Sequence, residues 1–320
     1  MIRVLLVVGI LVQFGIGMLT AQQAPQFLSV QRQTNSDVTL QIASTSGKYL
    51  RLEGADRLPE WHGLQTYKST GTNPIVDGSS AVLGTRFYRV VEVEEATPLT
   101  GDHLVTDDGE AVIHPINHAS FVMRWKDRYV YNDPVGGSSP YTGIPRASLI
   151  LISHSHSDHF DAATLSAVKQ NDTVIIAPAA VYSSLSVALK AQTIPLSNGS
   201  STNVLGIQVE AIPAYNANHP KGTGNGYVVT LGGRRIFMSG DTGNIAEMRA
   251  LTDIDVAFVC MNVPFTMTLA EAVTAVRAFR PRVTYPYHYR NQDNTQANVA
   301  SFRQQISADP SLEVRLRKWY

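Results

Sequence analysis

The amino-acid sequence predicts a small antiparallel β domain followed by a larger domain of the α/β class. From about residue 26 to residue 95, short segments of alternating polar and apolar residues are separated by turn-forming residues, which is typical of antiparallel strands. Further along the chain, strands alternate with helical segments, which is typical of an α/β domain. A chain of 320 residues is long enough for both domains.

The first 21 residues have the layout of a secretory signal peptide. Arg3 precedes an apolar stretch from Val4 to about Leu19, and Thr20-Ala21 follows before polar residues begin. This stretch is shorter than the roughly 20 apolar residues that span a bilayer. We therefore expect residues 1–21 to be cleaved. The mature protein would then be exported, to the periplasm or the medium, with no stable membrane anchor.

Residues 22–97 form the predicted β domain, and we expect a sandwich. The segments 38–42, 48–52 and 86–93 alternate in the manner of half-buried strands, and Gly, Asn, Pro, Asp and Ser cluster between them. The boundary is placed at Glu95-Ala96-Thr97-Pro98, where the pattern changes.

Residues 98–320 form the predicted α/β domain. A capping box at Thr268-Leu269-Ala270-Glu271 opens a helix that ends near Arg280, before Pro281. The other expected elements are a strand over 148–153, a helix over 162–170, a strand over 173–177, a helix over 179–190 and a hairpin around Gly232-Gly233.

Charge and cysteine content exclude several classes of protein. The 26 basic and 26 acidic residues give zero formal net charge, so no nucleic-acid partner is expected. The only cysteine, Cys260, cannot form an intramolecular disulfide and excludes an all-thiolate zinc site. It lies in the apolar run 256–260, which is typical of a core strand.

A cluster of metal-ligand residues follows a buried strand. The segment SHSHSDHFD, residues 153–161, contains three of the nine histidines of the chain. In an extended segment His154 and His156 point the same way, and Asp158 and His159 follow closely. Imidazole and carboxylate ligands together suit zinc, manganese or iron.

Three more residues of ligand type follow predicted strands elsewhere in the chain. His219 follows PAYNAN, Asp241 follows the strand 235–238, and His288 follows the strand 282–284. Loops at the ends of strands in one sheet converge at one edge, so these residues are expected to meet the histidine cluster.

The order HxHxDH, then His, Asp and His, resembles that of the metallo-β-lactamase superfamily, over about residues 99–320. The resemblance implies a four-layer αββα sandwich with a site for two divalent metal ions, zinc first, with manganese and iron as alternatives. It implies that one ion is bound by His154, His156 and His219, that the other is bound by Asp158, His159 and His288, and that Asp241 bridges them.

Within the superfamily, the sequence is more similar to the branch of ascorbate-6-phosphate lactonase and N-acylphosphatidylethanolamine phospholipase D. The residues that carry this likeness are PAYN before His219, GYVVTLGGRRIFMSGDTG through Asp241, and PFTMTLAEAV. Zinc β-lactamases commonly use a cysteine as a ligand of the second metal. Because Cys260 lies elsewhere, β-lactam hydrolysis is not the first choice.

Residues beside the ligands are candidates for supporting roles. Asp133 is expected to hydrogen-bond a histidine ligand. His118 is a candidate for the rim of the site or for a contact to a ligand. Tyr215, Asn216 and Arg290 flank ligands and could contact a small-molecule substrate or support a ligand. Arg290 would favour a phosphate or carboxylate group on the substrate.

The first functional hypothesis is an exported metal-dependent hydrolase in which a metal-bridging hydroxide attacks a small ester, lactone or amide. Asp158 and Asp241 are its expected catalytic residues: Asp241 bridges the two ions, and Asp158 holds the second ion and could orient the hydroxide. The alternatives are a phosphodiesterase or phospholipase D-like enzyme and, in a different class, a non-catalytic binding module stabilised by metal. The sequence makes no prediction of the oligomeric state.

Overall fold

A computed structural model describes residues 4–6, 24–33, 37–55, 61–77, 86–93, 99, 101–317 and 319–320. The chain divides into two compact units, Met1–Leu104 with Val112–His114 and Val105–Ala111 with Pro115–Tyr320. Of the predicted signal peptide, only Val4–Leu6 is described, as strand β1, and the remainder lies outside the described residues. Among the described residues, no helix is long and apolar enough to cross a membrane.

The N-terminal unit consists of two small sheets that enclose one core. One sheet has the order β1 (Val4–Leu6), β7 (Arg86–Val93), β4 (Tyr49–Ala55) and β5 (His62–Lys68), and the other has the order β2 (Gln26–Arg32), β3 (Val38–Ala43) and β6 (Thr72–Asp77). Leu40 and Ile42 of β3 are buried against Leu52 of β4 and Tyr88 of β7. The described strand pairs are antiparallel except for β1, which pairs parallel with β7.

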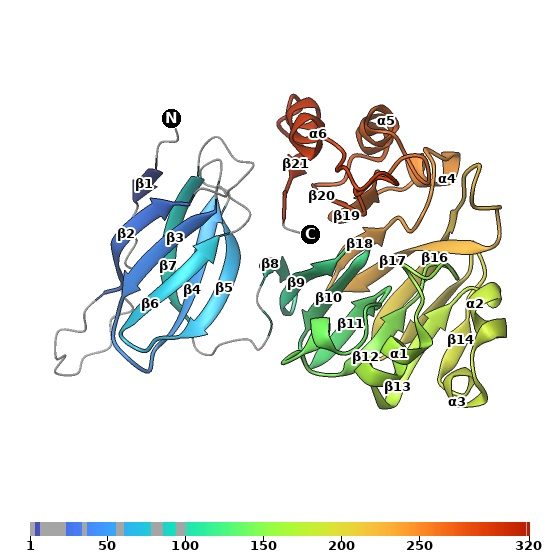
Figure 1. Cartoon of the computed structure of the whole chain (residues 1–320), viewed down its shortest axis with the longest axis horizontal. Coiled ribbons are helices and arrows are strands. Elements are labelled where there is room, and N and C mark those ends of the chain that lie inside the picture. The colour runs from blue at the N-terminus through green and yellow to red at the C-terminus, as the bar shows by residue number, and fades with distance from the viewer. Residues whose placement is uncertain are drawn as a thin grey trace. The chain divides into compact units, whose positions relative to one another are not determined.

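Two seven-stranded sheets form most of the remaining fold (Figure 1). The first has the order β14 (Thr193–Pro195), β13 (Lys169–Ala177), β12 (Ala147–Leu151), β11 (Arg128–Asn132), β10 (Ser120–Trp125), β9 (Gly109–Asn117) and β8 (Asp102–Thr106). The second has the order β15 (Ser201–Val204), β16 (Ile207–Ala214), β17 (Gly224–Leu231), β18 (Arg234–Met238), β19 (Val256–Cys260), β20 (Val283–Tyr287) and β21 (Glu313–Val314).

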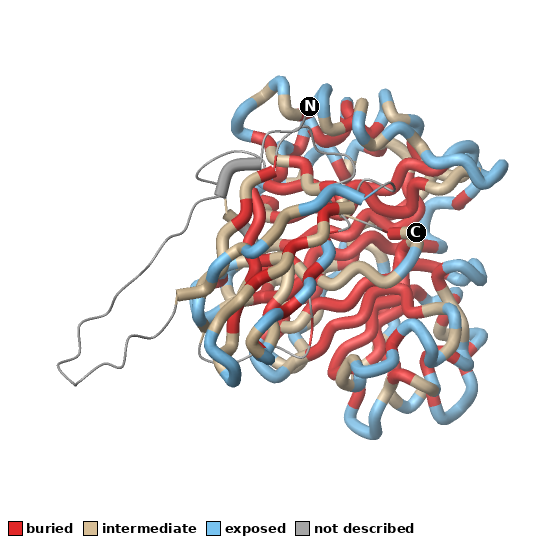
Figure 2. The backbone as a smooth tube through the Cα atoms, turned by 60° about the vertical axis from the view of Figure 1, so that its left-hand side comes forward, coloured by how far each residue is buried: buried red, intermediate tan, exposed pale blue. Residues whose placement is uncertain are grey.

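The main core lies between these two sheets. The rings of Phe121 in β10 and Phe258 in β19 stack with centroids 4.0 Å apart. Every residue of β12, β19 and β20 is buried (Figure 2), as expected for parallel strands covered on both faces. Cys260 is buried at the end of β19, in the predicted core strand.

Helices complete a four-layer αββα arrangement, which confirms the predicted fold class. The connections of the first sheet contain α1 (Ala162–Val168), α2 (Ala179–Ser184) and α3 (Val187–Lys190), together with the 3₁₀ turn η2 (Ser139–Tyr141). Those of the second sheet contain α4 (Ala246–Arg249), α5 (Leu269–Phe279) and α6 (Val299–Ile306). The predicted capping box of α5 is present, since Thr268 and Glu271 each bond the backbone of the other.

Two predicted helices differ from those in the structure. The helix expected over 179–190 is broken into α2 and α3, because Leu185 and Ser186 are extended and the Ser186 side chain accepts a hydrogen bond from the Leu189 amide as the cap of α3. The helix expected over 162–170 ends at Val168, because Lys169 is extended and begins β13.

Candidate metal centre

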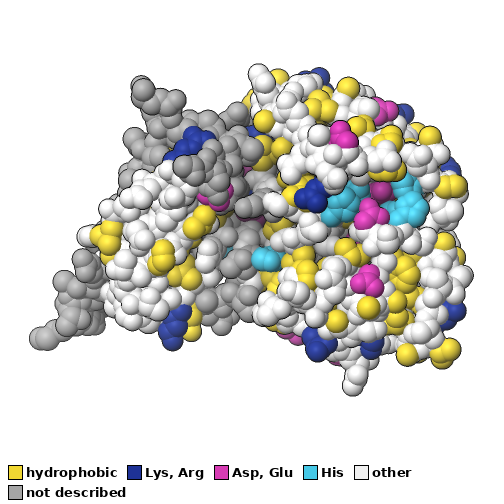
Figure 3. All heavy atoms as spheres, viewed as in Figure 1, with side chains coloured by type: hydrophobic (Ala, Val, Ile, Leu, Met, Phe, Trp, Pro, Cys, Tyr) yellow, Lys and Arg dark blue, Asp and Glu magenta, His cyan; other side chains and the backbone are white. Residues whose placement is uncertain are grey.

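The ligand-type residues lie where strands of both seven-stranded sheets end. Asp133 and the segment 153–159 follow β11 and β12, which are parallel neighbours. In the second sheet His219 follows β16, Asp241 follows β18 and His288 follows β20. Because β16, β18 and β20 run in the same direction, these residues meet at one edge. Figure 3 shows histidine and acidic side chains gathered there on the surface of this unit.

Three histidines form the first group of potential ligands. One nitrogen from each of His154, His156 and His219 lies within 4.8 Å of the others. His219 Nε2 and His156 Nδ1 are 3.2 Å apart. His154 and His219 are buried and His156 is exposed, so the group opens to solvent on the side of His156.

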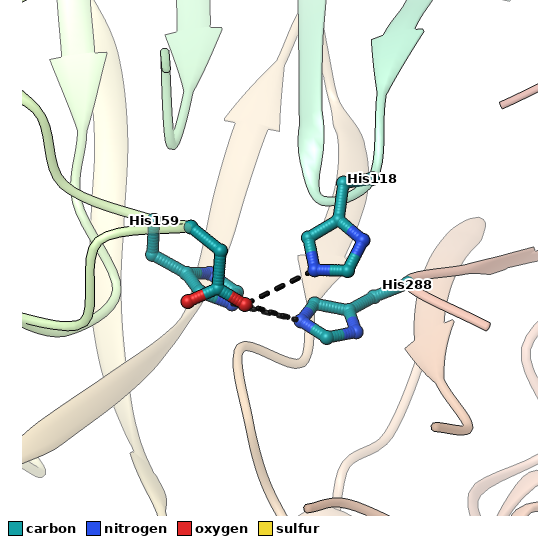
Figure 4. A group of neighbouring side chains, drawn as sticks. His118, His159 and His288 are labelled. Atoms are coloured by element: carbon teal, nitrogen blue, oxygen red, sulfur yellow. Dashed lines mark hydrogen bonds and ion pairs between the residues drawn. The ribbon is translucent and has the colours of Figure 1, made fainter. Parts of the chain in front are cut away.

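A second group consists of Asp158, His159, His288 and also His118, again with ligand atoms within 4.8 Å of one another. His288 Nε2 lies 2.9 Å from His159 Nε2, and both nitrogens lie within 3.7 Å of Asp158 Oδ2. Figure 4 shows the imidazoles of His118, His159 and His288 turned toward one another.

The Asp241 carboxylate lies between the two groups. Its Oδ1 is 3.2 Å from His159 Nε2 and 3.4 Å from His288 Nε2, whereas its Oδ2 is 3.5 Å from His219 Nε2 and 4.0 Å from His154 Nε2. Each oxygen therefore faces a different group, which is the geometry that a bridging ligand needs.

The backbone at the site takes conformations that few residues adopt. His118, Asp133 and His288 have φ values of 57°, 41° and 47°, in the left-handed region. Such positions cost free energy and cluster at functional sites. Gly240 has φ 57°, and a Cβ there would lie 2.8 Å from the Asn225 carbonyl oxygen, so the turn before Asp241 requires glycine.

Asp133 orients His159 through a buried network. His159 Nδ1 donates to Asp133 Oδ2 over 2.8 Å, and the Ser153 amide and hydroxyl also donate to this carboxylate, each over 2.7 Å. With the ring proton on Nδ1, the lone pair of His159 Nε2 faces the other ligand atoms.

Two more histidines are oriented in the same way. His219 Nδ1 donates to Asn216 Oδ1 over 3.0 Å, and His154 Nδ1 donates to Ser153 Oγ over 3.0 Å. Each imidazole is thereby left with the lone pair of Nε2 directed into the site.

Buried polar atoms without partners show that these residues fit a metal. Among the described residues, His154 Nε2 and Asp241 Oδ1 are buried and make no hydrogen bond. A buried polar atom left unpaired costs about 1–3 kcal/mol. A divalent cation would satisfy both atoms, and a set of nitrogen and oxygen donors suits zinc, manganese or iron.

At His154 and Asp241, burial and neighbouring charges favour the protonation states that metal binding requires. Burial, together with neighbouring imidazoles, lowers the pKa of His154 to about 2. Burial alone would raise the pKa of Asp241, but His288 and His159 hold it well below its usual range. His154 is therefore neutral and Asp241 ionised at neutral pH.

The remaining candidates have other contacts. The Tyr215 hydroxyl donates to Glu247 of α4 over 3.0 Å, and Lys221 lies over its ring, so Tyr215 braces the loop that carries His219. The Arg290 guanidinium lies 4.0 Å from the centre of the Tyr320 ring. Burial lowers the pKa of His118.

Two residues of the site were missed from the sequence. Ser153 belongs to the histidine motif itself, and its position after the strand could have marked it. Tyr320, whose hydroxyl lies 3.0 Å from His118 Nδ1, is 202 residues from its partner, and no local pattern marks it.

A family model and several known proteins match this chain. A sequence model described as "Beta-lactamase superfamily domain" matches residues 113–288. A metal-dependent hydrolase of Pelotomaculum thermopropionicum is 27% identical over 222 residues, covering 63% of this chain and 94% of that protein. One from Thermoplasma acidophilum is 29% identical over 197 residues, covering 58% of this chain and 86% of that protein.

A solved structure from Parabacteroides distasonis, described as that of a metal-dependent hydrolase, is 35% identical and has a TM-score of 0.62, covering 69% of this chain and all of that one. A metallohydrolase from Ignicoccus hospitalis shares the fold at 22% identity, with a TM-score of 0.57 over 64% of this chain and 94% of that one. The chain belongs to the metallo-β-lactamase superfamily and is a metal-dependent hydrolase of that superfamily.

Proposed function

We propose that the chain is an exported hydrolase that holds two divalent metal ions, zinc first, and cleaves a small ester, lactone or amide. The observation that supports it best is the position of Asp241, whose two oxygens face two separate groups of ligand atoms. One ion would be held by His154, His156 and His219, the other by Asp158, His159 and His288, with Asp241 shared between them.

When bound, the two ions supply hydroxide at neutral pH and polarise the group under attack. Hydrogen bonds within the chain orient the ligand side chains. Asp133 and Asn216 hold the rings of His159 and His219 with Nε2 directed inward. The Asp158 side chain is 47% exposed, so the second group of ligand atoms is open to solvent at this residue.

An open cavity of about 410 Å³ adjoins the loop that carries His219, and its size suits a small substrate. It is lined by Val263, Pro264, Asn291, Gln292 and Asp293. Asn218, next to His219, donates to the Pro264 carbonyl over 2.9 Å, so one wall of the cavity adjoins the His219 loop. Apolar and amide groups together with the Asp293 carboxylate favour an uncharged acyl group over a phosphate in this cavity.

The proposal is tested by assaying the purified mature chain, loaded separately with zinc and manganese, on p-nitrophenyl acetate, δ-valerolactone, p-nitroacetanilide and bis(p-nitrophenyl) phosphate. We expect turnover of at least one of the three carbonyl compounds that disappears in the Asp158→Ala variant. A protein that holds two ions and cleaves only the phosphate diester would contradict the proposed substrate class.

Arg290 favours phosphodiester hydrolysis as the second candidate function. Its guanidinium packs on the Tyr320 ring, and Tyr320 in turn contacts His118 of the second ligand group. Among the described residues no carboxylate pairs with Arg290, so its charge is available to an anionic substrate.

If the substrate carries an anionic group, we expect Arg290→Gln to raise KM about 10- to 100-fold with little change in kcat, since a charged hydrogen bond contributes roughly 1.5–3 kcal/mol. The measurement is steady-state kinetics on bis(p-nitrophenyl) phosphate and on a neutral ester. If KM and kcat were the same in the variant and the wild type on both compounds, Arg290 would not take part in substrate binding.

Removal of the metals should destabilise the protein as well as abolish hydrolysis. A ligand present at about 1,000 times its dissociation constant stabilises the folded state by roughly 4 kcal/mol. We expect chelation to lower the melting temperature of the unit that contains the site, and readdition of zinc to restore both properties. Calorimetry of apo and reloaded protein checks this, and an unchanged melting temperature would argue against ions bound at this site.

Export forms the remaining part of the proposal, and it depends on the apolar stretch after Arg3. Expression of the full chain in a bacterial host should yield a protein that begins at Gln22 and lies outside the cytoplasm. N-terminal sequencing of the fractionated protein checks this, and an intact N-terminus in the cytoplasm would contradict it.

A further inference from the structure

His118 occupies an unusual position beside the second ligand group. It lies in the turn between β9 and β10, and its ring centre is 3.7 Å from that of His288. Its Nε2 lies 3.0 Å from Asp158 Oδ2. Its backbone carbonyl accepts from the His288 amide over 3.1 Å, and its amide donates to the Trp319 carbonyl over 3.4 Å. The turn is therefore tied to a ligand and to the C-terminal segment at once.

The Tyr320 hydroxyl fixes the tautomer of His118. The phenolic oxygen accepts hydrogen bonds from the amides of Tyr289 and Arg290, each over 3.2 Å. With both lone pairs used, its own proton is left for the contact of 3.0 Å with His118 Nδ1. His118 Nδ1 is then an acceptor, so the ring proton lies on Nε2, which faces Asp158.

This arrangement differs from that of His159 and His219. Those rings are protonated on Nδ1 and direct a lone pair into the site, whereas His118 directs an N–H group into it. A nitrogen that carries a proton cannot bind a metal ion. His118 therefore approaches the second ligand group as a hydrogen-bond donor, although its distances alone would admit it as a further ligand.

Asp158 is the residue in the second group that most needs support. The loop residues 155–158 are all exposed, whereas His159 and His288 are buried. The hydrogen bond from His118 ties Asp158 to the turn between β9 and β10, a different segment of the chain. It restricts the carboxylate to an orientation facing His159 and His288.

We propose that His118 and Tyr320 are a pair of positioning residues: Tyr320 locks His118 as an Nε2–H donor, and His118 holds the Asp158 carboxylate in place to bind the second metal ion. The inference rests on the proposed two-ion site. Replacing either residue should weaken binding of the second ion and leave binding of the first almost unchanged. Among the described residues, His154, His156 and His219 share no hydrogen bond with His118 or Tyr320.

The test is a competition titration of the metal-free full chain with zinc against a chromophoric chelator. Loss of an outer partner of a ligand typically costs about 10- to 100-fold in metal affinity. We expect this loss of affinity for the second ion in Tyr320→Phe and in His118→Ala. Tyr320→Phe keeps the aromatic ring that packs on Arg290. His118→Gln retains an N–H donor and should recover part of the affinity. Equal second-ion affinity in wild type, Tyr320→Phe and His118→Ala would overturn the inference and leave the two-ion proposal standing.

Nitrogen NMR of the zinc-loaded, histidine-labelled protein supplies a readout that does not depend on affinity. We expect a proton on His118 Nε2 and none on Nδ1 in the wild type. An unprotonated Nε2 would overturn the inference, because His118 could then not donate a hydrogen bond to Asp158. A wild-type chain that takes up only one ion would overturn both this inference and the proposed function.

Discussion

Asp241→Asn is expected to reduce hydrolysis by at least about 10³-fold, equivalent to roughly 4 kcal/mol of transition-state stabilisation. The amide has nearly the shape of the carboxylate but lacks its charge. Since Oδ1 faces His159 and His288 while Oδ2 faces His154 and His219, the substitution weakens both proposed ion positions together. Metal analysis of the purified variant should find fewer ions than in the wild type.

The matched control is Asp127→Asn, the same chemical change at a side chain that is 78% exposed in the turn between β10 and β11. It should retain both the metal content and the turnover of the wild type. If Asp241→Asn kept two ions and full turnover, the carboxylate could not be a bridge between the two groups of ligand atoms.

Much of this site could be predicted from the sequence because its ligands follow strands. A residue after a buried strand is constrained to one edge of a sheet, so His219, Asp241 and His288 could be assigned to the edge of the HxHxDH loop before any contact was known. The four-layer fold followed from the resemblance that these residues carry, and the structure confirms it.

The supporting contacts were less predictable, because they depend on side-chain hydrogen bonds between distant segments. The sequence left Asn216 as a candidate for substrate contact or for support of a ligand, and its side-chain oxygen accepts a hydrogen bond from His219 Nδ1. Tyr320 carried no signal at all. The break between α2 and α3 was missed because the apolar pattern continues through it. Serine favours helix caps, and the Ser186 side chain accepts a hydrogen bond from the Leu189 amide where α3 begins.

Asp133→Ala is expected to destabilise the metal-free protein by about 3–5 kcal/mol. The carboxylate is fully buried and accepts from the Ser153 amide, the Ser153 hydroxyl and His159 Nδ1. Alanine would leave these donors without an acceptor in a region that water does not reach. His159 would also lose the contact that directs its Nε2 inward, so zinc affinity should fall roughly 10- to 100-fold. Denaturant unfolding of the apo protein and zinc titration measure the two effects.

Asp253→Ala provides a control that separates the hydrogen-bond network from the backbone. Asp253 is exposed and has φ 55°, close to the 41° of Asp133, so both substitutions place alanine in the left-handed region. An aspartate-to-alanine change there costs on the order of 1 kcal/mol through the backbone. If both variants lost the same stability, the network around Asp133 would contribute nothing beyond its backbone conformation. A much larger loss in Asp133→Ala, accompanied by weaker zinc binding, would show that this buried carboxylate supports the fold and the metal centre through the same three hydrogen bonds.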